Sequence, residues 1–294
     1  MTTRPAPGGT ARLAGRDVAR IGFGVMQLER LAADPAAAHA ILRAAVDAGV
    51  NHLDTAQFYG PGLCNDLIRQ ALHPYADDLV IVSKVGAERV DGGLVAAQRP
   101  EQLRAQVDAN LAGLGAERLD AVNVRRVDAP PGIVAEGDQV VDLDDQLAEL
   151  MALREEGKIG AIGLSNVSAA QLAQSLTADI ACVQNSYSVL DRASEPVLEL
   201  CRAHGIAWVP FCPLGSAFDW APSVADDPTV IAIAERLGVT PSQVGLAWLL
   251  AHDAGTLLIA GTANRDHLAD NLAAGDVRLP AEAVKELDDV ASAR

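Results

Sequence analysis

Basic residues are scarce in this sequence of 294 residues, which has 23 Lys and Arg against 39 Asp and Glu. The formal net charge of -16 repels phosphate backbones and anionic lipid headgroups, so we expect neither nucleic acid nor a membrane surface as a partner. No run of eighteen apolar residues passes without a charge or a turn signal, and the first twenty residues hold no apolar run of signal-peptide length. We therefore expect a cytoplasmic protein, a monomer or small homo-oligomer, that binds small molecules.

Several signatures of metal and nucleophile chemistry are also missing. The four cysteines form no C-x-x-C pair, which favours reduced packing thiols over a disulfide framework or a zinc site. These cysteines are Cys64, Cys182, Cys201 and Cys212. No G-x-S-x-G motif supports a serine hydrolase, and no cluster of histidines or carboxylates supports a metal-dependent one. Gly22 and Gly24 lack a third glycine, so the dinucleotide fingerprint of a doubly wound sheet is absent.

Short apolar runs alternate along the chain with segments of helical periodicity. The expected strands are residues 21–25, 50–54, 79–84, 119–124, 159–164, 180–185, 206–211 and 256–260. The expected helices are residues 35–50, 100–115, 142–158, 168–176, 194–205, 240–253 and 281–292. Eight such units predict a (β/α)8 barrel, whose parallel strands are buried on both faces. We expect one domain over residues 1–294, with a hairpin at 11–20 across the barrel floor and extra helices near the C-terminus.

Polar side chains end five of the eight expected strands. In a (β/α)8 barrel the C-terminal ends of the strands form the active site, so these side chains are expected at one mouth. They are Asp54, Lys84, Arg125, Ser165 with Asn166, and Gln184 with Asn185. Any one of them is more typical of a helix cap or a solvated charge, whereas the whole set predicts a site.

The stretch HLDTAQFYG, residues 52–60, is the most informative part of this set. Tyr59 follows Asp54 by five residues, on a loop that can return its phenol to the mouth beside Lys84. An ammonium at roughly 4 Å stabilises a phenolate by about 4 kcal/mol at an effective dielectric near 20, so we expect a lowered pKa for Tyr59. Asp54 would hold Lys84 charged, and Tyr59 would act as a general acid toward a carbonyl oxygen.

These residues, together with G-L-S-N at 163–166 and P-L-G-S at 213–216, resemble the aldo-keto reductase superfamily over essentially the whole chain. The resemblance implies a (β/α)8 barrel that binds NADPH extended across the strand ends, with Asp54, Tyr59 and Lys84 as catalytic residues. It implies cofactor contacts from Ser165, Asn166 and Gln184 at the carboxamide, Phe211 at the ring, Pro213, Leu214 and Gly215, and Gly261, Thr262, Arg265, His267, Asp270 and Asn271 on the adenine side. Among these, Thr262 is expected to cradle phosphate and Arg265 to contact a 2′-phosphate.

Arg125 departs from the pattern of this superfamily, most of whose members have histidine after the fourth strand. Period-two alternation places Asn123 and Arg125 on the lumen side, where a guanidinium can orient a carbonyl or bind an anion but cannot relay a proton. The alternative is that Arg125 turns outward to an ion pair with Asp128 or Asp120. His52 shares a face with Asp54 and is interpreted as a packed core residue.

The sequence NVR at 123–125, together with FYGP at 58–61 and LAWLL at 246–250, is similar to a bacterial branch of the superfamily that is associated with pyridoxal reduction. Pyridoxal carries an ionisable hydroxyl beside its aldehyde, which suits a guanidinium near Tyr59. The expected substrate pocket consists of Met26, Phe58, Asn123, Phe218 and Trp220. The main hypothesis is thus an NADPH-dependent carbonyl reductase acting on pyridoxal. The alternative is an NADPH-binding regulator or redox sensor that lost catalysis with the usual histidine.

Overall fold

A sheet of seven strands forms the centre of the protein, in the order β11-β10-β9-β8-β5-β4-β3. The computed structural model describes residues 6–215 and 220–292. Every neighbouring pair of strands in the sheet is parallel. The strands are β3 (Phe23–Gly24), β4 (His52–Asp54), β5 (Val80–Val85), β8 (Leu119–Arg125), β9 (Ile159–Ser165), β10 (Ile180–Gln184) and β11 (Ala207–Trp208). Each lies within one residue of an expected strand or inside it.

The eighth expected strand, residues 256–260, forms single bridges instead of a regular ladder. Leu258 bridges to Ile21 at one edge of the sheet, and Thr256 bridges to Trp208 at the other, both in the parallel sense. Two backbone hydrogen bonds of 2.8 Å, Gly22 N to Leu258 O and Leu257 N to Trp208 O, support these bridges. Because one segment joins both edges, the sheet closes, and the predicted (β/α)8 barrel is confirmed.

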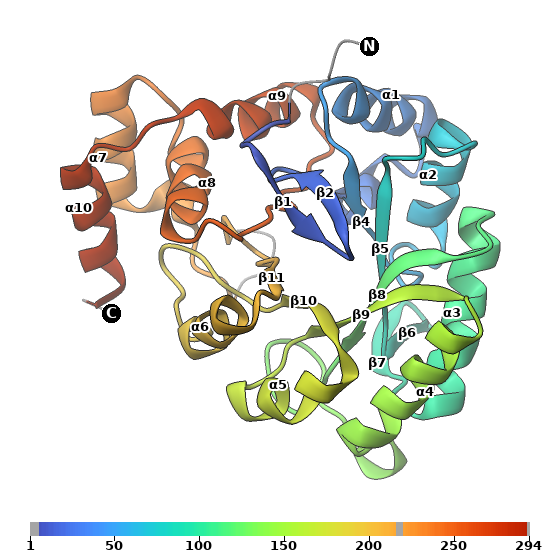
Figure 1. Cartoon of the computed structure of the whole chain (residues 1–294). Coiled ribbons are helices and arrows are strands. Elements are labelled where there is room, and N and C mark those ends of the chain that lie inside the picture. The colour runs from blue at the N-terminus through green and yellow to red at the C-terminus, as the bar shows by residue number, and fades with distance from the viewer. Residues whose placement is uncertain (1–5, 216–219, 293–294) are drawn as a thin grey trace.

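Helices surround the strands, as Figure 1 shows. Those that the sequence predicted are α1 (Pro35–Asp47), α3 (Pro100–Leu114), α4 (Leu143–Glu155), α5 (Ala169–Ser175), α6 (Glu195–His204), α8 (Pro241–His252) and α10 (Ala281–Ser292). Three more were missed, namely α2 (Leu63–Leu72), α7 (Pro228–Leu237) and α9 (Arg265–Ala273). The 3-10 helices are η1 (Met26–Leu31), η2 (Gly137–Gln139), η3 (Leu176–Ala178), η4 (Val224–Asp226) and η5 (Ala274–Asp276).

The ends of α7 show that the sequence did contain signals for this unpredicted helix. Asp227 accepts hydrogen bonds from the backbone amides of Thr229 and Val230, and Gly238 ends the helix in the left-handed region. By contrast, α2 begins after Gly62, whose φ of 85° is also left-handed, and has no side-chain cap. Its start therefore has no conventional sequence signal.

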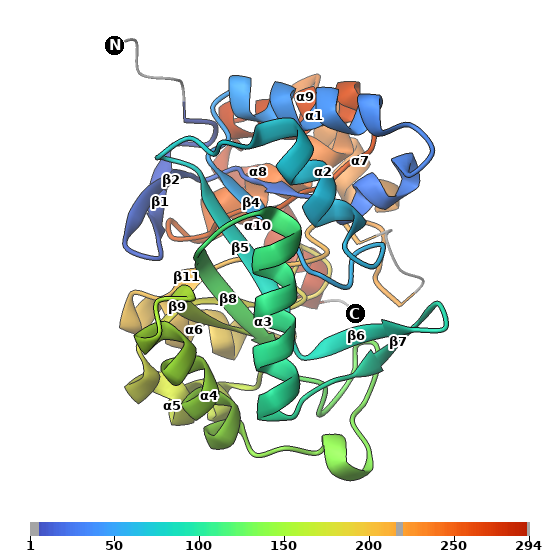
Figure 2. The same cartoon turned by 90° about the vertical axis from the view of Figure 1, so that its right-hand side faces the viewer.

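Two hairpins lie at opposite ends of the barrel in Figure 2. The predicted one pairs β1 (Thr10–Leu13) with β2 (Arg16–Ala19), and its Leu13 and Val18 pack into the barrel interior. The other pairs β6 (Ala87–Val90) with β7 (Gly93–Ala96), two strands that were not among the expected ones. Since β1 and β2 cover the floor, ligands have access from the opposite end.

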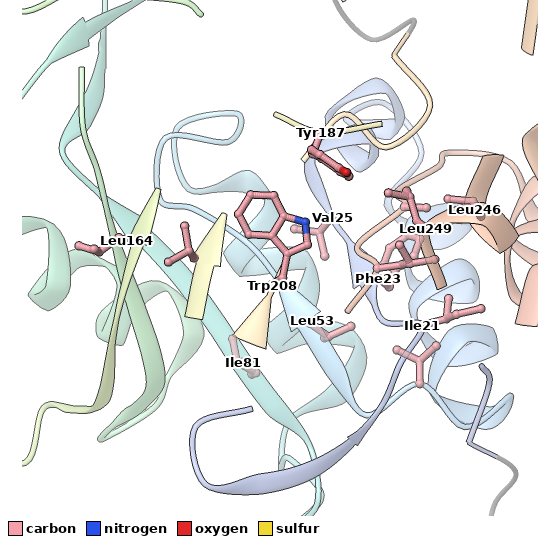
Figure 3. Close-up of a cluster of buried hydrophobic side chains, with 14 of the residues drawn as sticks. Ile21, Phe23, Val25, Leu53, Ile81, Leu164, Tyr187, Trp208, Leu246 and Leu249 are labelled. Carbon is pink, nitrogen blue, oxygen red and sulfur yellow. The ribbon is translucent and has the colours of Figure 1, made fainter. Parts of the chain in front are cut away.

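The main hydrophobic core lies between the sheet and the helices and includes the residues labelled in Figure 3. Trp208 is 1% exposed, and the Tyr187 ring packs edge-on against it with 5.7 Å between centroids. All four cysteines are free thiols, and Cys64, Cys182 and Cys201 are buried. His52 is buried too, with its ring against Gly22, and burial lowers its pKa to about 4. Within the described residues, no helix combines the length and apolar character that crossing a bilayer requires.

Candidate active site

A cavity of about 710 Å³ opens at the C-terminal ends of the strands. Asp54 ends β4, Lys84 lies near the end of β5, and Arg125 ends β8. Tyr59 reaches the same cavity from the loop between β4 and α2, and Phe211 reaches it from the segment after β11. The parallel barrel thus brings together the side chains that the sequence placed at strand ends.

Asp54 and Lys84 form a buried ion pair at the base of this cavity, with side-chain exposures of 4% and 5%. Besides Asp54, the Lys84 ammonium donates a hydrogen bond of 3.1 Å to the carbonyl of Thr55. The other carboxylate oxygen of Asp54 accepts one of 2.6 Å from Gln184. Burial by itself lowers the pKa of Lys84, but attraction to Asp54 and Tyr59 outweighs it, so that the pKa is raised. Lys84 is therefore an ammonium at neutral pH.

Tyr59 corrects one expectation from the sequence, since its pKa is raised and not lowered. Burial penalises the phenolate, and this effect is larger than the stabilisation from Lys84. Asp54 also opposes the formation of a second negative charge nearby, and Arg125 offsets only part of this. The Lys84 ammonium lies 5.0 Å from the centre of the Tyr59 ring. The phenol is accordingly protonated at neutral pH, which is the form that a proton donor needs.

The Arg125 side chain turns into the cavity. Its guanidinium carbon lies 5.6 Å from the centre of the Phe211 ring, and Nη2 donates a hydrogen bond of 3.1 Å to the carbonyl of Pro131. Nε is buried and has no hydrogen-bond partner among the residues that the structure describes. Burial lowers the pKa of Arg125, while Tyr59 and Cys212 act in the opposite direction.

The neighbouring arginine takes the carboxylate that the alternative interpretation assigned to Arg125. Arg126 binds Asp128 through Nε at 2.8 Å and Nη2 at 2.6 Å. Asp120 pairs instead with Arg16 at 3.2 Å and accepts the backbone amide of Ile81. The outward ion pair of Arg125 is therefore not formed, because alternation along β8 directs Arg125 inward.

Three comparisons with known proteins bear on this arrangement. The profile of the aldo/keto reductase family matches residues 20–292. The chain belongs to the aldo/keto reductase family. It is 40% identical over 288 residues to pyridoxine 4-dehydrogenase of Escherichia coli (strain K12), with 96% of this chain and 98% of that protein covered. It is 31% identical to an uncharacterized oxidoreductase of Schizosaccharomyces pombe, covering 96% of this chain and 89% of that one.

Solved structures agree with the family assignment. An aldo-keto reductase from Klebsiella pneumoniae in complex with NADPH superposes with a TM-score of 0.79 at 26% identity, covering 96% of this chain and 94% of that chain. The same values hold for a structure from that organism with NADP and acetate. The predicted family and fold are thus confirmed.

The expected cofactor residues of this aldo/keto reductase fall into two groups. Nine of them line the cavity, namely Phe211, Pro213, Leu214, Gly215, Gly261, Thr262, His267, Asp270 and Asn271. Ser165, Asn166, Gln184 and Arg265 are not among the lining residues. Arg265 is the exposed first residue of α9, and its expected contact with a 2′-phosphate stays a prediction.

Ser165, Asn166 and Gln184 lie deeper than the cavity lining, at the ends of β9 and β10. Ser165 Oγ and Gln184 Oε1 are buried, and within the described part of the chain neither has a hydrogen-bond partner. Buried polar groups are normally satisfied, so a hydroxyl and an amide oxygen without partners fit a ligand that carries its own amide. Asn166 is used differently, because its amide nitrogen binds the carbonyls of Arg126 at 3.1 Å and Ala129 at 3.0 Å.

Close backbone contact shapes the far end of the cavity in this aldo/keto reductase. A Cβ on Gly261 would lie 2.1 Å from the carbonyl oxygen of Gly24, so only glycine permits this approach. Thr262 Oγ1 accepts the backbone amide of Asn264 at 3.0 Å, and Asn264 in turn caps α9. Gly261, Thr262 and His267 line this end of the cavity, where phosphate sites of such barrels occur.

The predicted substrate pocket is only partly placed in the cavity. Met26, Phe58 and Trp220 line it, whereas Phe218 lies outside the described residues. Asn123 does face the lumen, but it is fully buried below the cavity, where Cys182 donates to it at 3.2 Å. Its place in the pocket is therefore corrected. No group of three or more His, Cys, Asp or Glu suited to a metal occurs in the part of the chain described.

Sequence reasoning missed a further group of cavity residues in this aldo/keto reductase. They are Arg89 and Leu94 from the β6–β7 hairpin, Glu29 and Arg30 from η1, Pro131 and Gly132 after β8, and Thr240 and Ser242 at the start of α8. For the hairpin a signal existed, because Asp91 and Gly92 between two alternating segments are typical of a two-residue turn. Both residues have positive φ, 50° and 82°.

Proposed function

We propose that this protein is an NADPH-dependent aldehyde reductase whose substrate is pyridoxal, reduced to pyridoxine. The observation that carries the proposal is the inward position of Arg125, whose side chain lines the same cavity as Tyr59. The name of the Escherichia coli relative and the NADPH complex of the Klebsiella pneumoniae structure support the same activity.

The residues present fit a nicotinamide cofactor. Ser165 and Gln184 offer the buried hydroxyl and amide oxygen that a carboxamide can satisfy. Phe211 presents an aromatic ring to the cavity, and Thr262 lies near the capped N-terminus of α9. When bound, NADPH supplies the hydride that reduces the carbonyl carbon.

The catalytic roles proposed here follow from protonation states. Tyr59 is a protonated phenol and donates its proton to the carbonyl oxygen of the substrate. The phenolate left behind is stabilised by Lys84, which Asp54 keeps charged and in place. Arg125 cannot exchange a proton at neutral pH, so its role is to bind and orient the substrate.

Pyridoxal suits this arrangement because its ring hydroxyl is next to the aldehyde. With that hydroxyl ionised, the guanidinium of Arg125 forms a charge-assisted hydrogen bond while the aldehyde faces Tyr59. A hydrogen bond to a charged group contributes about 1.5–3 kcal/mol, which corresponds to about 10- to 150-fold in kcat/KM. This factor predicts how strongly Arg125 discriminates between aldehydes.

The test compares pyridoxal with pyridine-4-carbaldehyde, which lacks the ring hydroxyl, by following the loss of NADPH absorbance. The wild type should favour pyridoxal by about 10- to 150-fold, and Arg125→Met should lose most of that preference. Tyr59→Phe should abolish turnover of both aldehydes while cofactor binding persists. If Arg125→His preserves or raises pyridoxal turnover relative to the other aldehyde, the substrate assignment fails. Tight NADPH binding without turnover of any aldehyde would instead support the alternative function, an NADPH-binding regulator or redox sensor that lost catalysis.

A further inference from the structure

Two charged residues that pair with each other, Arg89 and Glu29, contact the backbone on the two sides of Tyr59. Arg89 Nε donates a hydrogen bond of 3.3 Å to the carbonyl of Phe58, the residue before Tyr59. Its Nη1 donates one of 3.0 Å to the carbonyl of Gly92, within its own hairpin turn. The remaining nitrogen, Nη2, lies 3.8 Å from a carboxylate oxygen of Glu29.

Glu29 packs against the residue on the other side of Tyr59. A Cβ on Gly60 would lie 3.3 Å from Cγ of Glu29, so the glutamate stem rests on the Gly60 backbone. Burial raises the pKa of Glu29, and Arg89 and a hydrogen bond from the Gly60 backbone oppose this rise. Glu29 therefore faces the loop after Tyr59 with its stem and the guanidinium that holds the loop before it with its carboxylate.

The pair joins two walls of the cavity that are far apart in the sequence. Arg89 comes from β6, in the hairpin that extends beyond the barrel end in Figure 2, and Glu29 comes from η1. Their side chains are 34% and 28% exposed, and both residues line the cavity. Leu94 of the same hairpin and Tyr59 both pack against the small apolar cluster that contains Phe58. The position of the Tyr59 loop thus depends on the hairpin.

We propose that Arg89 and Glu29 are positioning residues that hold the Tyr59 loop so that the phenol stays beside Lys84 and the bound carbonyl. This inference rests on the proposed function, in which Tyr59 is the proton donor. Arg89 acts on Phe58 and Glu29 acts on Gly60, while their ion pair keeps the two contacts together. Neither residue exchanges a proton with the substrate.

The test uses Arg89→Gln, Glu29→Gln, the double variant and Arg89→Lys. Arg236→Gln is the matched control, because Arg236 forms an exposed ion pair of 2.8 Å with Glu286 far along the chain. A misplacement near 1 Å costs on the order of 100-fold, so kcat with saturating NADPH should fall by about 10- to 100-fold in each Gln variant. The KM for NADPH should stay within about twofold, and Arg89→Lys should recover part of kcat. Because the two residues act as one unit, kcat of the double variant should be little lower than kcat of the less active single variant.

A second measurement does not depend on turnover. Hydrogen exchange of the backbone amides in residues 57–63, followed by mass spectrometry, should be faster in both Gln variants than in the wild type and in the Arg236→Gln control. If these amides exchange at the wild-type rate in both Gln variants, the inference is overturned, even if the protein proves inactive. Unchanged kcat overturns it too, as does a raised KM for the aldehyde with unchanged kcat, which would make Arg89 a substrate contact. By contrast, an inactive wild type, or an active Tyr59→Phe variant, overturns the proposed function.

Discussion

Breaking the Asp54–Lys84 pair from either side should destabilise the fold strongly. Both side chains are almost fully buried, so Asp54→Asn leaves an ammonium with only neutral acceptors among the described residues, such as the new amide oxygen and the carbonyl of Thr55. Lys84→Met leaves a carboxylate whose remaining described donor is the amide of Gln184. Removing one partner of a buried ion pair costs about 3–5 kcal/mol, and we expect that loss in the free energy of unfolding for each single variant.

The double variant decides whether this cost comes from the uncompensated charge. Asp54→Asn combined with Lys84→Met buries no net charge, so it should be destabilised far less than the sum of the two single changes. Urea denaturation at pH 7 measures all four proteins, with the midpoint and slope of each transition giving the free energy of unfolding.

A surface pair provides the matched control. Lys158 and Asp108 are 2.7 Å apart but 32% and 51% exposed, so the same two substitutions there should each cost less than about 1 kcal/mol. If the Asp54 and Lys84 variants are additive and as mild as this control, the pair is not desolvated as the structure describes, and the reasoning on Lys84 fails.

Two further predictions concern Ser165 and the loss of folding stability at alkaline pH. An unsatisfied buried hydroxyl costs about 1–3 kcal/mol, so Ser165→Ala should preserve or raise the free energy of unfolding of the cofactor-free protein while weakening NADPH binding roughly fivefold. Denaturation and fluorescence titration measure the two effects, and a destabilised variant with unchanged binding contradicts this role. Tyr59 and Lys84 both have raised pKa values, so the folded state binds their protons more tightly than the unfolded chain. Their contribution is complete below the unfolded pKa values of about 10 and is lost as the pH rises through the folded values. Denaturation from about pH 8 to about pH 11 should show this decline, and Tyr59→Phe should make it shallower; an equally steep decline in that variant argues against a raised pKa of Tyr59.

The sequence by itself determined the barrel and which strand-end side chains meet at its mouth. Apolar runs alternating with helical segments leave little choice but parallel strands joined by helices, and parallel strands end at one edge. Asp54, Lys84 and Arg125 were therefore expected at one mouth from their places in the chain alone. Alternation favoured the inward direction of Arg125, whose strand extends up to that residue, but the structure was needed to decide against the outward ion pair.

Only the tertiary structure decided the electrostatics and the supports of this group. The direction of the Tyr59 pKa depends on burial and on the sum over Lys84, Asp54 and Arg125, whereas the sequence offered a single attractive pair. Arg89 and Glu29 are sixty residues apart, and their contact exists because a hairpin folds back over the cavity. Local patterns fix strands and their faces, but desolvation and long-range contacts arise when distant segments pack together, so they could not be read from the order of residues.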